Sequence, residues 1–169
     1  DWQQKQTDNL NLLKENYNAE LQLLKAQIHP HFLFNTLNNI YFFVLSEPAK
    51  AKHLVKKLEK LLYYIINECN ERTVPLSKEI NMIHDYLELE KIRYSNIDID
   101  LKITGDYKNK KIAPLLMLPF IENSFKHGAS KMISEPWIKL FIQADEHLLH
   151  FIITNNKPAY NIVTERHGI

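Results

Sequence analysis

The sequence has 169 residues, of which 45% are hydrophobic, so it is long enough to bury the core of one medium domain or two small ones. Lysine and arginine total 21 against 20 aspartates and glutamates, and this net charge of +1 argues against nucleic acid or an acidic membrane surface as a partner. The single cysteine, Cys69, excludes an intrachain disulfide framework, and a count of only three glycines favours a helix-rich architecture.

Residues 1–22 are predicted to form a coiled-coil linker. They contain neither glycine nor proline, and their apolar residues recur with an approximate heptad spacing. The positions concerned are Leu10, Leu13, Tyr17 and Leu21, and Leu24 just beyond the linker continues the spacing. The sequence starts without a basic and apolar leader, and we expect it to be a piece of a longer protein.

The stretch from Lys25 to Asn38 contains a proline, Pro30, with one histidine on each side of it. It lies within a predicted amphipathic helix that should end near Ser46, because the residue before Pro48 is disfavoured in the helical region. Pro30 costs about 3 kcal/mol in a helix interior, so we expect a kink that has a functional reason. Polar side chains at helical spacing form one stripe, which consists of Gln27, His31, Asn35 and Asn38.

His31 on this stripe can be approached from outside, whereas His29 points to another side of the helix. An ordinary solvated surface histidine is the alternative interpretation of His31. A metal site shared by His29 and His31 is disfavoured, because side chains two residues apart on a helix diverge by about 200°.

Residues 28–46 carry no charge and are long enough to cross a bilayer. They include three asparagines and two histidines, each of which is costly in hydrocarbon. We therefore interpret this segment as a helix of a buried bundle, and we expect any membrane anchor to lie outside this chain.

A second amphipathic helix is predicted over residues 49–71, with Pro48 at a position where the first helical turn tolerates proline. Its apolar seam consists of Leu54, Leu58, Leu61 and Ile65. Cys69 continues the helical spacing of this apolar side, which favours a core residue over a nucleophile. Two helices joined by a tight turn cannot enclose a core alone, so we expect a homodimer that forms a four-helix bundle.

A third helix is predicted over residues 78–94, with Ser77 as its N-cap and Glu79 near its positive end. From Ile97 to Ile103 the pattern changes to strict alternation, which predicts a half-buried strand. The elements expected after it are a helix over 112–128 and strands over 137–143 and 148–154. The fold class is thus mainly α plus α+β, with a boundary between the two halves near residue 96.

A second polar cluster lies on the helix predicted around residue 120. Glu122, Asn123, Lys126 and His127 share one face of that helix. A carboxylate, an amide, an ammonium and an imidazole together suit a nucleoside triphosphate with magnesium. An ordinary solvated helix face is the alternative.

Three stretches, taken in order, resemble the LytS-type family of sensor histidine kinases. They are Gln27-Ile-His-Pro-His-Phe-Leu-Phe-Asn-Thr-Leu-Asn38, Leu87-Glu-Leu-Glu-Lys-Ile-Arg93 and Pro119-Phe-Ile-Glu-Asn-Ser-Phe-Lys-His-Gly128, in a match from about residue 23 to 156. The resemblance implies a dimeric phosphoacceptor hairpin over 23–96, followed over 97–169 by the N-terminal part of a Bergerat-type ATPase domain, a truncated α/β sandwich. It also implies membrane-spanning sensory segments outside this chain.

The resemblance implies a role for each candidate site residue. His31 corresponds to the phosphoacceptor, and Asn123 to the asparagine that binds Mg²⁺, beside the acid Glu122. Lys126 and His127 would lie along the phosphates of ATP, and Asn155 or Asn156 would meet the adenine.

The chemistry of imidazole agrees with this assignment. Its unperturbed pKa of roughly 6.5 leaves it mostly neutral at pH 7, so attack on a phosphoryl group needs little activation. We expect Gln27 or Asn35, one turn away on either side, to orient His31. Glu122 is the expected proton acceptor.

The sequence departs from the family pattern in three places. His29 occupies a position that is typically asparagine, and Thr154-Asn-Asn-Lys-Pro158 stands where the family has an Asp-x-Gly-x-Gly motif for adenine. The chain ends at His167-Gly168-Ile169, which resembles the opening of a glycine-rich phosphate lid. We therefore expect this piece alone to bind ATP poorly and to be inactive.

The sequence thus predicts the cytoplasmic core of a two-component sensor kinase from a bacterial inner membrane. Its expected activity is ATP- and Mg²⁺-dependent autophosphorylation of His31, followed by transfer to an aspartate of a response-regulator protein. The alternative is a non-catalytic dimeric signalling module with a degenerate ATPase domain.

Overall fold

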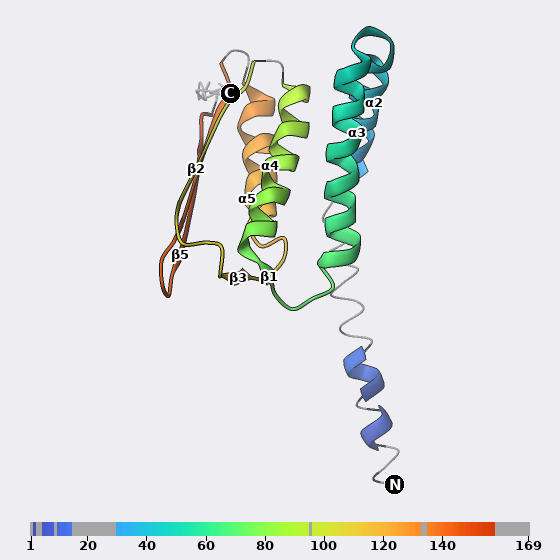
Figure 1. The fold of residues 1–169 in the computed structure, drawn as a ribbon, viewed down its shortest axis with the longest axis vertical. Helices are drawn as coiled ribbons and strands as arrows, with labels where there is room; N and C mark the ends of the chain where they lie inside the picture. Colours follow the sequence, from blue (N-terminus) through green and yellow to red (C-terminus); the bar gives the residue numbers. More distant parts are fainter. Residues whose placement is uncertain are drawn as a thin grey trace, which may run out of the picture.

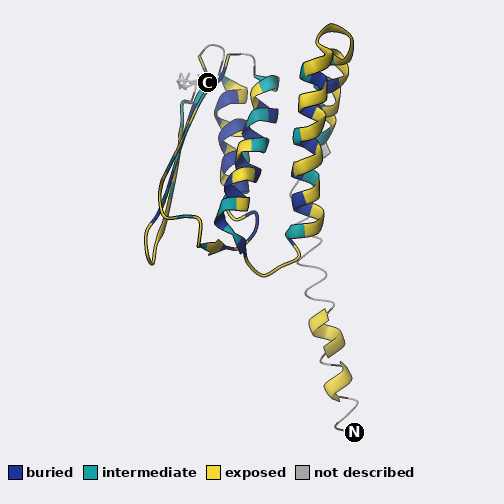
Figure 2. Cartoon of the chain, viewed as in Figure 1, coloured by how far each residue is buried: buried dark blue, intermediate teal, exposed yellow. Residues whose placement is uncertain are grey.

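The computed structural model describes residues 2, 5–8, 10–14, 30–94, 96–132 and 135–157. From residue 30 onward, a helical hairpin, a pair of helices and a β-sheet form three successive layers (Figure 1). Residues 5–8 and 10–14 are helical and exposed, and they lie away from these layers towards the N-terminus (Figure 2). Most of the predicted coiled coil, the kink before Pro30 and the side chains of Gln27 and His29 fall outside the described residues.

The hairpin consists of α2 (Pro30–Ser46) and α3 (Pro48–Tyr63). Glu47 between them has a non-helical backbone, and Pro48 occupies the first turn of α3, so both predicted helix ends are confirmed. A single π-helical turn, η1 (Tyr64–Glu68), continues α3. The predicted seam of α3 is buried, and so is Cys69 beyond η1, as its spacing indicated.

Helix α4 (Leu76–Arg93) starts earlier than the sequence suggested, and Ser77 is not its N-cap. Pro75 holds the cap position without a side-chain hydrogen bond, and Ser77 lies inside the first turn. The reason is a non-local pairing, in which β1 (Val74–Pro75) runs antiparallel to β3 (Lys111–Ile112). The N–H of Leu76 donates a hydrogen bond of 2.8 Å to the carbonyl of Lys110. This bond satisfies one of the N–H groups in the first turn of α4, which is the role that a serine N-cap would have.

The larger sheet has the order β2 (Asp98–Gly105), β4 (Trp137–Ala144) and β5 (Leu149–Asn155). Strands β2 and β4 are parallel, and β4 and β5 are antiparallel, so all three predicted strands are confirmed. Every second residue of β4 is buried, as expected for a strand with one face against helices. At Gly105, φ is 84°, and an added Cβ would lie 2.1 Å from the carbonyl oxygen of Ala144, so the strand end requires glycine.

Helix α5 (Leu118–His127) is shorter than the predicted helix over 112–128. Ile112 belongs to β3, where it pairs with Val74, and Leu115 adopts a φ of 60° that no α-helix can contain. The short 3₁₀ turn η2 (Ala129–Lys131) follows α5. The segment around Pro114 is therefore a buried turn rather than the start of a helix.

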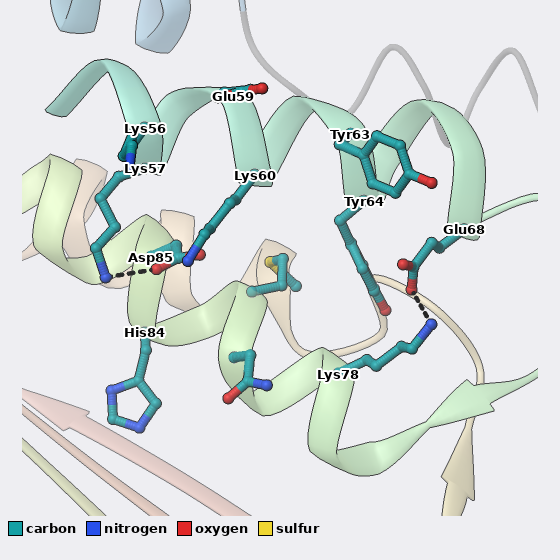
Figure 3. Close-up of a pocket in the computed structure, with 12 residues that line it drawn as sticks. Lys56, Lys57, Glu59, Lys60, Tyr63, Tyr64, Glu68, Lys78, His84 and Asp85 are labelled. Carbon is teal, nitrogen blue, oxygen red and sulfur yellow. Dashed lines mark hydrogen bonds and ion pairs between the residues drawn. The ribbon is translucent and has the colours of Figure 1, made fainter. Parts of the chain in front are cut away.

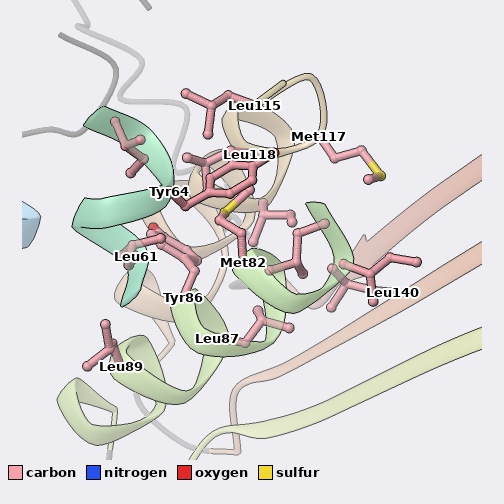
Figure 4. Packing of buried hydrophobic residues seen from close by; sticks show 14 of the residues in the cluster. Leu61, Tyr64, Met82, Tyr86, Leu87, Leu89, Leu115, Met117, Leu118 and Leu140 are labelled. Atoms are coloured by element: carbon pink, nitrogen blue, oxygen red, sulfur yellow. The ribbon is translucent and has the colours of Figure 1, made fainter. Parts of the chain in front are cut away.

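One hydrophobic core joins the layers. Leu61 and Tyr64 from the hairpin side pack with Met82, Leu118 and Leu140 from α4, α5 and β4 (Figure 4). Buried residues line both α4 and α5, which lie between the hairpin and the sheet (Figure 2). Among the helices that the structure describes, none combines the length and the apolar character required to span a bilayer.

Glu79 is the polar centre of this core. Its side chain is completely buried, and one carboxylate oxygen, Oε2, accepts hydrogen bonds from the hydroxyl of Tyr64 and from the N–H of Leu115. Burial raises the pKa of Glu79 above its ordinary value. The carboxyl group thus connects the end of the hairpin to the strained turn before α5.

Candidate functional site

A cavity of about 450 Å³ lies where α2, α4 and α5 meet. His31 reaches it from the first turn of α2, and Glu122, Asn123 and Lys126 reach it from α5. Helix α4 completes the wall with Tyr86, Glu90 and Arg93, and Tyr94 follows directly after it. The fold therefore brings the two polar motifs of the sequence into one cavity.

The position of His31 is set by the residue after it. Phe32 is buried, and its ring stacks on Tyr86 of α4 with a centroid distance of 4.9 Å. This contact holds the first turn of α2 against α4 while His31 itself stays exposed. The amide nitrogen of Asn35 lies 3.2 Å from both ring nitrogens of His31, so Asn35 is the described candidate that contacts the imidazole.

An aromatic cluster orients α5 in the same way. Phe125 is buried and stacks on Tyr94 at 5.7 Å, with its edge towards Tyr86 at 6.2 Å. With Phe125 and Ile121 facing inward, the neighbouring positions Glu122 and Asn123 are turned towards the surface. Packing thus decides which face of α5 is available to His31.

Two carboxyl groups of the cavity have unusual proton affinities. Burial, and then the nearby charge of Glu90, raise the pKa of Glu122 to about 7. Burial also raises the pKa of Glu90, whose Oε1 accepts a hydrogen bond of 3.3 Å from the hydroxyl of Tyr86. Glu122 can therefore take up or release a proton near neutral pH.

Asn123 also lines a second cavity of about 320 Å³ on the other side of α5. His127, Asn155 and Lys157 line this second cavity. The end of α5 comes so close to β5 that a Cβ on Gly128 would lie 2.2 Å from the amide nitrogen of Asn155. Glycine at this position allows the approach that brings the α5 and β5 residues together.

Asn156 has a different environment from Asn155. Its Oδ1 accepts a hydrogen bond of 2.9 Å from the N–H of Trp137, and its amide donates at 2.9 Å to the carbonyl of Glu135. These bonds fix the chain before β4, and Asn156 lines neither of the two cavities described above.

A wider cavity of about 750 Å³ separates α3 from α4 and contains none of the predicted site residues. Lys57 spans it to Asp85 at 2.7 Å, and Lys78 reaches Glu68 at 2.9 Å (Figure 3). Lys57 also contacts Glu88 at 2.8 Å, and these partners raise its pKa. The cavity thus contains the ion pairs that tie the hairpin to α4.

The residues present fit a magnesium ion that is carried by a nucleotide. Within the described ranges there is no group of three or more His, Cys, Asp or Glu side chains that could hold a metal by itself. Asn123 offers an amide oxygen, and Mg²⁺ usually takes only one or two protein ligands, with water and phosphate oxygens supplying the rest.

No motif in the sequence gives a role to Tyr86, Glu90, Arg93 or Tyr94. Residues 87–93 stand out only as part of the family resemblance. The available signal was the spacing of Glu90 and Arg93, three residues apart on a helix, which places both on the same side as Tyr86.

Comparison with known proteins gives consistent matches. The family model described as histidine kinase matches residues 19–97. "Sensor protein LytS" of Enterococcus faecalis is 29% identical over 146 residues, which cover 86% of this chain and 24% of that protein. "Sensor histidine kinase BtsS" of Escherichia coli K12 is 29% identical over 89% of this chain and 27% of its own length.

A third relative, "Sensor protein kinase HptS" of Staphylococcus aureus USA300, is 29% identical over 81% of this chain and 26% of its own length. The chain therefore spans about a quarter of the length of these curated relatives.

Proposed function

We infer from these matches that the chain belongs to the LytS-type family of sensor histidine kinases, and from this premise we propose that it carries the ATP-dependent phosphorylation of His31. In a second step His31 passes the phosphoryl group to an aspartate of a response-regulator protein. The observation that carries the proposal is the cavity that His31 shares with Glu122, Asn123 and Lys126.

In the first step the lone pair of an imidazole nitrogen of His31 forms a bond to the γ-phosphorus of ATP. The bond from that phosphorus to the bridging oxygen breaks, and its electron pair leaves on ADP. Glu122 accepts the imidazole proton, for which its raised pKa is suited. Asn35 holds the ring in the required orientation.

The nucleotide lies along α5 in this proposal. Asn123, between the two cavities, helps to hold Mg²⁺, which neutralises charge on the phosphates when bound. Lys126 and His127 lie along the phosphates. Asn155 meets the adenine on the side of the second cavity, while Asn156 fixes the backbone beside it.

The proposed assembly is a homodimer. An apolar row at heptad spacing is exposed along α2 and consists of Phe34, Leu37, Tyr41 and Val44. A second copy that covers this row completes a four-helix bundle from two hairpins. The hairpin and α4 form the dimerisation and phosphoacceptor unit over 23–96, preceded by the linker over 1–22 and followed over 97–169 by the ATPase part.

We further propose that the chain lies on the cytoplasmic side of a bacterial inner membrane, linked to it through segments outside this sequence. Nucleic acid is not a proposed partner, because the net charge is only +1.

Labelling of the native full-length protein with radioactive ATP tests the proposed activity. His31→Gln and Asn123→Ala should each abolish acid-labile phosphate, the first by removing the acceptor and the second by weakening the magnesium site. His29→Asn is the matched control and should keep the label.

Label that persists in His31→Gln, or disappears in His29→Asn, contradicts the assignment of His31. A wild-type protein that binds Mg·ATP and takes up no label would instead support the non-catalytic signalling module.

A further inference from the structure

We propose that Arg93 is a further catalytic residue, whose guanidinium contacts the phosphoryl oxygens while the group passes from ATP to His31. The inference rests on the proposed function and deepens it. The bond changes remain those of the first step, with N–P formed, P–O broken and the electron pair left on ADP. Arg93 adds hydrogen bonds to the transferring group and exchanges no proton.

The first observation is the place of Arg93 in the fold. It is the last residue of α4 and lines the same cavity as His31 of α2. Lys126 reaches that cavity from α5. Two cations from different helices thus border the space next to the acceptor imidazole.

The second observation is how the guanidinium is held. Its Nη1 lies 3.9 Å from Oε2 of Glu90, and its central carbon lies 5.1 Å from the centre of the Tyr94 ring. Glu90 is 4% exposed, and its Oε2 is buried without a hydrogen bond in the part of the chain that the structure describes. A buried carboxylate and an aromatic ring therefore restrain an arginine whose side chain is still 33% exposed.

The surrounding charges leave Arg93 available for an anion. The groups around the cavity are His31 from α2, Glu90 and Tyr94 from α4 and its end, and Glu122 and Lys126 from α5. The 3.9 Å between Arg93 Nη1 and Glu90 Oε2 is longer than a direct hydrogen bond, so Glu90 does not saturate the guanidinium. An incoming phosphoryl group can therefore compete for it.

The chemistry of phosphoryl transfer gives arginine a specific advantage. The transition state is loose, with its charge spread over three equatorial oxygens, so catalysis depends on positioning and charge stabilisation. The planar guanidinium donates two parallel hydrogen bonds to such oxygens, whereas an ammonium acts as a point charge. Lys126 alone therefore cannot replace Arg93.

The first experiment measures single-turnover labelling of the full-length protein at saturating Mg·ATP, beside the affinity for Mg·ADP. Arg93→Gln should slow labelling by about 10³-fold, at the lower end of the known effect of a transition-state arginine. Arg93→Lys should lie between it and the wild type. Affinity for Mg·ADP should change less than about threefold, because ADP lacks the group that Arg93 contacts. Arg72→Gln, an exposed arginine before β1, is the matched control and should label normally.

A second readout needs no nucleotide. Phosphoramidate can phosphorylate His31 chemically, and the ³¹P resonance and hydrolysis rate of the product then report on neighbouring donors. Arg93→Gln should shift the resonance and change the hydrolysis rate relative to the wild type, whereas Arg72→Gln should change neither.

Wild-type labelling rates in Arg93→Gln, together with an unchanged ³¹P resonance, would overturn the role of Arg93 and leave the proposed function intact. An equal loss of ADP affinity would also overturn it, because Arg93 would then bind nucleotide rather than the transferring group. Label that survives in His31→Gln would reject the proposed function itself.

Discussion

The hairpin and the sheet half of this molecule bury their apolar residues to different extents. In β4, Ile138 and Ile142 are 0% exposed, because α4 and α5 cover that face of the sheet. In α2, Tyr41 is 76% exposed and Leu45 is 88% exposed, although both are large apolar side chains. The sheet half thus covers its core within one chain, whereas the hairpin leaves a row of large apolar side chains in water.

This difference separates two kinds of burial. The covered face of the sheet is buried by contacts within one chain, so its burial should not depend on protein concentration. In the proposed dimer the exposed row of α2 is covered by a second copy, so its burial should increase with concentration.

The largest expected effect is in the covered core of the sheet. Ile142→Ala should lower the free energy of unfolding by about 2–5 kcal/mol, because it leaves a cavity beneath α4 and α5. Ile152→Ala on the exposed side of β5 is the matched control and should cost at most about 0.5 kcal/mol. Urea unfolding followed by circular dichroism measures both changes. Equal losses in the two variants would show that the two faces of the sheet are equally covered.

The next expected effect concerns the proposed dimer, which should dissociate while each protomer stays folded. Tyr41→Glu places a charge in the exposed row of α2 and should weaken the dimer by about 2 kcal/mol or more, roughly thirtyfold in Kd. Tyr41→Phe, which keeps the size and the apolar ring without a charge, is the matched control. Light scattering over a concentration series measures the change. A wild-type protein that stays at 20.0 kDa at tens of micromolar would contradict the dimer itself.

Leu61 would be a poor choice for the same experiment. It belongs to the predicted seam, but it is 1% exposed within a single chain, where it packs in the shared core. A charge at Leu61 should therefore unfold the protomer as well as separate the dimer.

A smaller effect tests the link between the two regions. Tyr64→Phe removes a hydrogen bond to the buried carboxyl of Glu79 and should cost about 1–3 kcal/mol of unfolding free energy. Tyr63→Phe changes the neighbouring exposed tyrosine and should have almost no effect. Thermal unfolding of the two variants at one pH gives the comparison. A similar melting temperature for both would mean that the link contributes nothing to stability.

The smallest effect is a dependence of stability on pH. In the folded protein the pKa of Glu122 is raised to about 7, and those of Glu79 and Glu90 are raised as well, so the native state holds extra protons above pH 4.5. Stability should therefore fall as pH rises above about 4.5, and the part of this fall that is due to Glu122 should level off above pH 7. The pKa of Lys57 is raised and that of Glu88 is lowered, so neither group titrates within this pH range.

Glu122→Gln should flatten this profile, with melting temperatures at pH 5 and pH 8 that differ less than in the wild type. A profile as steep as that of the wild type would assign the dependence to other groups.

Much of the fold follows from local patterns. Helical spacing predicts α2, α3 and α4, and alternation predicts the three strands, because each pattern reflects one buried face. The beginning of α5 does not follow, since the pairing of Val74 with Ile112 and the positive φ of Leu115 depend on residues far apart in the sequence. The same pairing moved the start of α4 away from Ser77.

The candidate site likewise contains some residues that the sequence predicts and others that it does not. Polar stripes on two helices and the resemblance to a family predict His31, Glu122, Asn123 and Lys126 as a set, and one cavity contains all four. Glu90 and Arg93 could not be assigned, because their place beside His31 depends on Phe32 packing against Tyr86. Such a contact between distant residues leaves no periodic signal in the sequence.

The π-helical turn at Tyr64–Glu68 amounts to a one-residue insertion in a helix. One extra residue rotates all later side chains by about 100° relative to those before it, and here both Tyr64 and Ile65 point inward. Deletion of a single residue after Tyr64 within this turn would restore a regular α-helix and rotate Cys69 and the chain leading to α4 relative to α3. The orientation of the hairpin relative to α4 therefore depends on the exact number of residues in this segment as much as on its composition.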